Sequence, residues 1–263
     1  MIYKYINFDK IINIITNKDK LFIGDYIIDP YQNCEFGCKY CDSSYDNVIY
    51  IKNDFLNKVE KEILNFNKGT IIIGSIVDPY QYIEKELKMT RNLLKIIKKN
   101  HFNVHILTKS DLILRDIDIL SKMENVTVTI SIISLNKNLS KFFEKKVPSS
   151  LKRLKIIKEL SNNGIKTGLA IIPILPYFIE KEIEDIIKIS LAYKSSYLLY
   201  KFLELKGFQK NIFYNYLKLF KNDLLNKYIK LYKDKYLPET NYIKSINDKI
   251  SYYSRKHNLP NNI

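Results

Sequence analysis

Short apolar segments alternate with amphipathic segments along most of this chain, and this alternation limits the available folds more than any other feature. The apolar segments are rich in Ile, Val and Leu, which is typical of buried parallel strands, and we expect strands at 21–28, 70–75, 103–108, 126–132, 165–172 and 197–203. Between them apolar residues recur at helical spacing, which predicts helices at 53–66, 84–99, 115–123, 150–162 and 179–193. Six such units predict an α/β fold, an incomplete (β/α)6 parallel barrel with right-handed crossovers.

The pattern changes from Gly207 onward, where strand-like segments no longer occur. Long segments rich in Tyr and Lys predict helices at 209–236 and 242–257, separated near Pro238. We therefore expect residues 1–205 to form the barrel and residues 206–263 to form a helical C-terminal extension packed on it. Two interpretations of the extension stay open: a surface that stacks bases and neutralises phosphates, or helices that close the barrel with tyrosines in the core.

The chain has three cysteines, and all of them fall within eight residues: Cys34, Cys38 and Cys41. Three thiolates at the spacing C-x3-C-x2-C can hold three irons of a cubane cluster and leave the fourth iron free for a small molecule. An electron carrier of the ferredoxin type closes its cluster with a fourth cysteine, which this sequence lacks. The spacing therefore indicates an open metal site.

Zinc is the main alternative occupant of this site. The histidines are His101, His105 and His257, which lie far from the cysteines and do not match the compact ligand spacing of zinc modules. A disulfide is disfavoured by the odd count. The alternative function is thus a non-catalytic iron–sulfur or zinc protein with a nucleic-acid-binding role.

Tyr40 gives the cysteine motif the form C-x3-C-x-aromatic-C, which resembles the signature of the radical S-adenosylmethionine (radical SAM) enzymes. The resemblance implies two cofactors, a [4Fe–4S] cluster and S-adenosyl-L-methionine. In that family the cluster cleaves S-adenosylmethionine reductively, and the resulting 5′-deoxyadenosyl radical abstracts hydrogen from a substrate. The resemblance also implies an electron donor, such as a flavodoxin or a ferredoxin, as a partner.

A second set of motifs is similar to the radical SAM proteins grouped with spore photoproduct lyase, over roughly residues 20–205. It comprises Gly-Ser-Ile-Val-Asp-Pro-Tyr-Gln at 74–81, Thr-Arg at 90–91, Thr-Lys-Ser at 108–110, Leu-Arg-Asp at 114–116 and Pro-Ile-Leu-Pro at 173–176. Authentic spore photoproduct lyases use one further cysteine as a hydrogen donor, and this chain departs from them because it has none.

This closer resemblance implies roles for individual residues. Lys109 and Ser131 would contact the carboxylate and ribose of S-adenosylmethionine, with Arg153 as a further partner. Gly74 and Ser75 stand where many members carry a Gly-Gly-Glu clamp on the methionine amino group, and the Glu is absent. Tyr40, in the aromatic position of the cysteine motif, is the remaining residue expected to bind the cofactors. Positions at or after strand ends add four candidates for the substrate side: Asp78, Gln81, Glu84 and Tyr200. No catalytic residue is assigned beyond the cluster ligands.

The formal net charge of +15 is compatible with a polyanionic partner, so nucleic acid is the leading substrate class. The lysines are spread along the whole chain, and coding bias is the alternative source of the charge. Charged residues interrupt every apolar segment before it could span a bilayer, and the amino terminus has no signal-peptide pattern. We therefore expect a cytoplasmic protein without a membrane partner.

Overall fold

A curled sheet of seven strands forms the centre of the computed structural model, which describes residues 1–17, 21–44 and 47–263. Six strands run parallel and β2 pairs antiparallel at one edge. In spatial order they are β10 (Leu198–Phe202), β9 (Lys166–Ile174), β8 (Val126–Ile132), β7 (Asn103–Thr108), β6 (Thr70–Ile73), β3 (Tyr26–Ile27) and β2 (Asn13–Ile14). The expected incomplete parallel barrel is confirmed.

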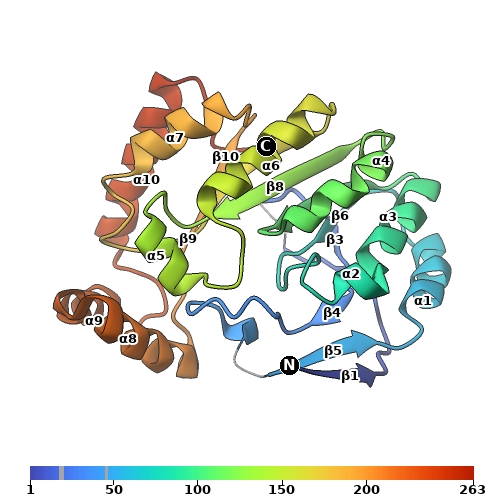
Figure 1. The fold of residues 1–263 in the computed structure, drawn as a ribbon, viewed down its shortest axis with the longest axis horizontal. Helices are drawn as coiled ribbons and strands as arrows, with labels where there is room; N and C mark the ends of the chain where they lie inside the picture. Colours follow the sequence, from blue (N-terminus) through green and yellow to red (C-terminus); the bar gives the residue numbers. More distant parts are fainter. Residues whose placement is uncertain (18–20, 45–46) are drawn as a thin grey trace.

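Helices cover the outer face of the curled sheet (Figure 1). They bury Ile, Leu and Val side chains against the strands, and most of this apolar surface belongs to one large cluster. The helices of the barrel are α1 (Phe55–Glu62), α2 (Glu84–Leu87), α3 (Met89–Lys99), α4 (Ile117–Leu120), α5 (Lys137–Phe143), α6 (Ser150–Asn162) and α7 (Ile183–Ala192).

Two expected helices are interrupted. The segment 84–99 breaks into α2 and α3 because Lys88 adopts a left-handed conformation, with φ of 53°. The segment 115–123 is shorter than expected: a 3-10 helix (Asp111–Asp116) precedes the single turn of α4. Helix α5 was not expected from the sequence. It begins after Asn136, whose side chain accepts hydrogen bonds from two backbone N–H groups of its first turn.

A second, small sheet was also unexpected. It contains β1 (Ile2–Ile6), β5 (Val48–Lys52) and β4 (Tyr31–Gln32), with β5 in the middle. This sheet supports the cysteine segment, because β4 ends two residues before Cys34 and the Tyr3 hydroxyl donates to Glu35 over 2.6 Å.

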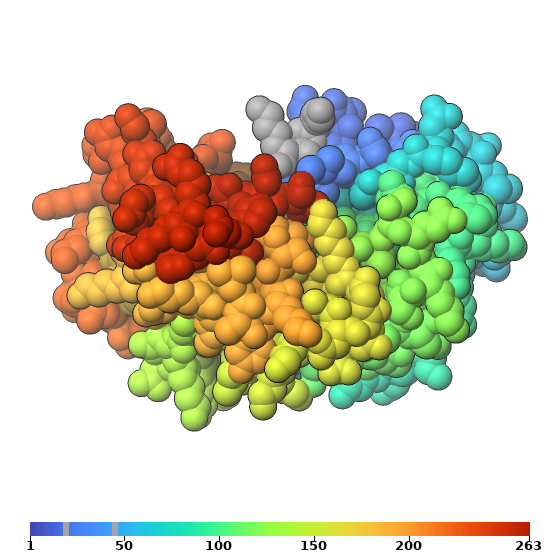
Figure 2. Space-filling view, turned by 90° about the horizontal axis from the view of Figure 1, so that it is seen from above, coloured from blue at the N-terminus to red at the C-terminus, as the bar shows by residue number. Residues whose placement is uncertain are grey.

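The C-terminal residues form α8 (Gly207–Lys221), α9 (Leu225–Tyr232) and α10 (Thr240–Lys256). Helix α10 lies beside α7, where Lys256 and His257 both meet Glu184. The chain then returns to the sheet, because the backbone N–H of Leu198 in β10 donates to the Pro260 carbonyl. Figure 2 shows these last residues next to the N-terminal segment. No helix in the described ranges is long and apolar enough to cross a membrane.

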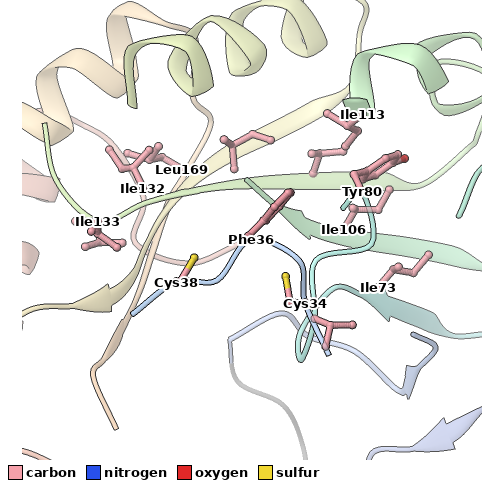
Figure 3. Close-up of a cluster of buried hydrophobic side chains, with 14 of the residues drawn as sticks. Cys34, Phe36, Cys38, Ile73, Tyr80, Ile106, Ile113, Ile132, Ile133 and Leu169 are labelled. Atoms are coloured by element: carbon pink, nitrogen blue, oxygen red, sulfur yellow. The ribbon is translucent and has the colours of Figure 1, made fainter. Parts of the chain in front are cut away.

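The concave face of the sheet has its own small apolar cluster, which includes Phe22, Leu107 and Tyr197. Gly168 makes room for Tyr197, since a Cβ at this glycine would lie 2.1 Å from the ring. Figure 3 shows Cys34, Phe36 and Cys38 along one segment at the margin of the large cluster, near side chains such as Ile73. The cysteine segment is therefore packed against the core.

Candidate cofactor site at the carboxyl edge of the sheet

A cavity of about 330 Å³ opens where β6, β7, β9 and β10 end, and Cys34, Cys38 and Cys41 all line it. The carboxyl ends of parallel strands are the usual location of active sites in barrels of this type. Its volume is within the range of small-molecule sites. The segment 34–41 thus brings all three thiols to one side of this cavity.

The thiols differ in exposure, since Cys34 and Cys38 are buried and Cys41 is half-buried. Burial raises the pKa of Cys34 to about 12, and the nearby Asp78 carboxylate adds to this effect. Burial also raises the pKa of Cys38, while the positive charge of Lys109 opposes the shift. Both thiols therefore keep their protons in the free chain, and a metal must displace these protons when it binds.

Lys109 lines the cavity directly after β7 and brings a positive charge close to Cys38. Burial disfavours this charge, but an ionised Cys38 and the Glu144 and Asp78 carboxylates raise the pKa of Lys109, so the ammonium group stays charged. Asp78 also lines the cavity. It accepts 2.7 Å hydrogen bonds from the Thr108 hydroxyl and the Lys109 backbone N–H, and it thereby fixes the turn after β7.

Gly74 and Ser75 line the cavity directly after β6. Only glycine fits at position 74, because φ is +93° and a Cβ would lie 2.1 Å from the Leu107 carbonyl oxygen. The backbone N–H of Gly74 donates to the buried Asp29 carboxylate over 3.1 Å. The Ser75 hydroxyl is buried and has no hydrogen-bond partner within the described structure. A ligand in the cavity would supply one.

Tyr40 lines the cavity and is held by groups far away in the sequence. Its hydroxyl donates to the buried Glu144, and its backbone carbonyl accepts from the Gln209 side chain of α8. Arg153 does not line the cavity. Its guanidinium donates to Glu144 and to the Ser131 carbonyl. Arg153 therefore contacts Tyr40 only indirectly, through the glutamate that both residues share. The Ser131 hydroxyl is likewise outside the cavity and donates to the Ile172 carbonyl over 3.0 Å.

Gln81 and Glu84 are buried outside the cavity. Gln81 accepts a 2.8 Å hydrogen bond from the backbone N–H of Glu35 and so holds the cysteine segment. Glu84 accepts from the Tyr31 hydroxyl and is paired with Arg115 over 2.7 Å. Both side chains thus join the segment after β6 to the chain just before or within the cysteine segment.

Tyr200 also lies outside the cavity, with its ring against Phe202 and the large apolar cluster. Its sequence neighbour Lys201 lines the cavity instead and pairs with Glu204 over 2.8 Å. Lys206, a second lining residue, pairs with the same glutamate. The sequence reasoning missed Glu144 and Gln209 as partners of Tyr40, because no local pattern connects residues so far apart.

The described parts of the chain contain no group of three or more His, Cys, Asp or Glu side chains that could hold a single metal ion. The cysteines share a cavity without meeting this geometry. In a cubane cluster each cysteine binds a separate iron, so the three thiols need not converge on one point.

A family model for the Radical SAM superfamily matches residues 28–189 of the chain. The chain belongs to the radical SAM superfamily. Membership implies S-adenosylmethionine and a [4Fe–4S] cluster as cofactors, and the expectation of a radical SAM protein is confirmed.

Sequence relatives support this assignment. An uncharacterized protein of Methanocaldococcus jannaschii is 35% identical over 176 residues, which are 63% of this radical SAM chain and 66% of the relative. An uncharacterized protein of Mycobacterium tuberculosis is 21% identical over 169 residues, covering 57% of the chain and 50% of the relative. The chain therefore spans between half and two thirds of the length of these curated relatives.

Solved structures show the same fold. A spore photoproduct lyase variant with bound AdoMet and dinucleoside spore photoproduct aligns with a TM-score of 0.68 at 16% identity, covering 89% of this chain and 74% of the lyase chain. Streptococcus suis SuiB bound to its precursor peptide SuiA aligns with a TM-score of 0.63 at 16% identity, covering 90% of this chain and 47% of the SuiB chain. The expected likeness to spore photoproduct lyase is confirmed in the fold.

The residues around the cavity fit the cofactors of the superfamily. Three thiols can ligate iron, Lys109 can meet a carboxylate, and the partnerless Ser75 hydroxyl can meet an amino group. The absence of a side chain at Gly74 lets the turn after β6 pack directly against the Leu107 carbonyl.

Proposed function

We propose that this chain is a radical SAM enzyme. A [4Fe–4S] cluster on Cys34, Cys38 and Cys41 would supply one electron to cleave S-adenosylmethionine into methionine and a 5′-deoxyadenosyl radical. The observation that carries the proposal is that the three thiols, Lys109 and the Gly74-Ser75 turn line a single cavity at the carboxyl edge of the sheet.

The protein's own groups bind and orient the cofactor in this proposal. Lys109 offsets the charge of the methionine carboxylate, and the Ser75 hydroxyl accepts from the methionine amino group. Tyr40, held by Glu144 and Gln209, forms part of the cavity wall beside Cys38 and Cys41. The buried Tyr40 ring helps to keep water from the reacting atoms.

We further propose nucleic acid as the leading substrate class, with a peptide or a small metabolite as the alternatives. The fold likeness to spore photoproduct lyase and the net charge of +15 support nucleic acid. The absence of a fourth cysteine argues against the lyase's own route of hydrogen return, so the reaction on the substrate differs from that route.

The test is anaerobic reconstitution with iron and sulfide, followed by chemical reduction in the presence of S-adenosylmethionine. We expect about four irons and four sulfides per chain and the formation of 5′-deoxyadenosine, measured by chromatography. Replacement of Cys34, Cys38 or Cys41 by Ala should abolish both the cluster and the product.

Other outcomes would separate the alternatives. Full iron loading and unchanged cleavage in Cys38→Ala would contradict the assignment of this ligand. A stable cluster that never yields 5′-deoxyadenosine would favour a non-catalytic iron–sulfur protein, and a single bound zinc ion without iron would favour the zinc alternative.

A further inference from the structure

An open pocket of about 320 Å³ borders the cysteine segment from outside the cofactor cavity. Phe36 lines both hollows. This residue stands between Cys34 and Cys38 in the sequence, and its side chain is 2% exposed. The outer pocket therefore comes within one side chain of the place where the cluster would be bound.

Four lysines line this outer pocket, and we call them the basic rim: Lys85, Lys145, Lys146 and Lys152. Lys152 is paired with Asp111, which is the acidic residue of the pocket lining. The other three are exposed and form no ion pair within the described structure. Lys146 reaches the cysteine segment itself, because its ammonium nitrogen would lie 3.9 Å from a Cβ on Gly37.

An aromatic pair lines the same pocket as the basic rim. The rings of Phe36 and Tyr82 meet edge to face with centroids 5.5 Å apart, and Tyr82 is 46% exposed. The Tyr82 hydroxyl donates to the Lys146 carbonyl, which ties the rim to the segment after β6. Aromatic side chains next to a polar, charged rim are typical of protein interfaces.

The position of the basic rim distinguishes two anionic partners. A nucleic-acid substrate must reach the inside of the cofactor cavity, from which Phe36 separates this pocket. An electron donor needs only a close approach to the cluster and no access to the cavity. The basic rim lies where the second requirement is met and the first is not.

We propose that the basic rim is the docking site for an acidic one-electron carrier protein, which reduces the cluster. This inference rests on the proposed function, because only a redox-active cluster requires such a partner. The carrier loses one electron and the oxidised cluster gains it, with no bond formed and no group exchanged between the two proteins. Charge complementarity accelerates such encounters and makes them sensitive to salt.

The test uses the reconstituted protein, an acidic flavodoxin reduced to its hydroquinone, and the charge-reversed variant Lys85→Glu/Lys145→Glu/Lys146→Glu. Two quantities are measured at low and high salt: the rate of cluster reduction from its visible absorbance, and the affinity for fluorescently labelled flavodoxin from anisotropy. At low salt we expect the variant to lose at least about tenfold in both. The wild-type rate should fall toward that of the variant as salt rises.

The control variant carries the same change of charge at the opposite end of the sheet, near the loop that leads into β7: Lys95→Glu/Lys99→Glu/Lys122→Glu. Photoreduced 5-deazariboflavin serves as a small reductant that needs no docking surface. We expect all three proteins to be reduced equally by it. They should then yield equal amounts of 5′-deoxyadenosine.

Equal flavodoxin-driven rates and affinities in the two charge-reversed variants would overturn the proposal. So would a loss of DNA or RNA affinity in the basic-rim variant while flavodoxin-driven reduction is unchanged, because the rim would then serve the substrate. If the deazaflavin-reduced wild type makes no 5′-deoxyadenosine, the proposed function fails, and flavodoxin binding still reports on the basic rim independently.

Discussion

Lys109 brings a half-buried positive charge to the cofactor cavity immediately after β7. Asp78 fixes the backbone at this lysine through a 2.7 Å hydrogen bond, so the direction of the side chain is set by the turn itself. The charge is available to a ligand because Lys109 forms no ion pair within the described structure. A carboxylate placed there would gain a charge-assisted contact.

Replacing Lys109 with Ala should weaken S-adenosylmethionine binding and leave the cluster intact, because a carboxylate partner is lost and no metal ligand is. A lost charge-assisted contact costs about 1.5–3 kcal/mol, which is a Kd roughly 10- to 150-fold higher. Titration of the reconstituted protein with S-adenosylmethionine measures it. Lys166→Ala, at the amino end of β9, is the control, and an unchanged Kd in Lys109→Ala would contradict the role.

Sequence patterns located some cavity residues and not others for a simple geometric reason. Gly74, Ser75 and Lys109 follow directly after strands, and strand ends meet at one edge of a parallel sheet. Tyr200 is inside a strand, where successive side chains alternate between faces, and Lys201 takes the inward position. Arg153 is on a helix, and its partner Glu144 could not be found by any spacing rule.

At the scale of elements, α8 and α9 form a packed layer beside the barrel. Phe213 of α8 stacks on Phe143 of α5 with centroids 5.8 Å apart. Tyr228 of α9 is fully buried, and its hydroxyl donates to the Pro176 carbonyl over 2.7 Å. These contacts place two aromatic side chains of the extension in the core, while Tyr236 is exposed.

Replacing Tyr228 with Ala should lower the free energy of unfolding by about 3–5 kcal/mol, because a large buried ring is lost. Urea unfolding followed by circular dichroism measures the change. Tyr228→Phe keeps the ring and leaves one carbonyl without its donor, so a smaller loss of about 1–3 kcal/mol is expected. Tyr252→Ala, at a site that is 57% exposed, should change stability little, and an equal effect at both sites would refute the packing role.

The six parallel strands were predictable because each is part of a short apolar run bounded by turn residues. The small sheet was not predictable in the same way. In β1 most side chains are exposed, and the strand Ile2–Ile6 has no alternation of polar and apolar residues that would set one face against a core. Its pairing with β5 depends on residues 46 positions later, beyond the reach of a local pattern.

At the scale of the whole molecule, the net charge of +15 is the property with the widest consequences. If nucleic acid is the substrate, the protein should bind single- or double-stranded DNA or RNA at low salt. Its affinity should then fall steeply as salt rises, because neutralised phosphates release counterions. Fluorescence anisotropy at two salt concentrations measures this, and absence of binding at low salt would remove nucleic acid from the candidate substrates.

The buried Asp29 should make stability depend on pH. Burial raises its pKa to about 6, against the hydrogen bond from Gly74 and the charge of Lys52, while the unfolded chain keeps the ordinary value of 3.8. The folded state therefore holds this proton longer than the unfolded state. Stability from this group is full below about pH 4 and is lost as pH rises to about 6, by about 3 kcal/mol.

Comparison of the wild type with Asp29→Asn should isolate this effect. Both free energies of unfolding are measured in urea between pH 4 and pH 7. As pH rises over this range, the wild type should lose about 3 kcal/mol of stability relative to Asp29→Asn. Asp54→Asn, which removes an exposed carboxylate, controls for the loss of one charge. A difference that does not vary with pH would show that Asp29 titrates outside this window.

The contact between Tyr40 and Gln209 joins parts of the chain that a ribosome makes at different times. They are 169 residues apart, so at 5–20 residues per second Gln209 is synthesised roughly 8–34 s after Tyr40. Until α8 emerges and folds, the loop with the three thiols lacks this clamp. The proposed cluster site is therefore complete only after α8 has folded against the cysteine segment.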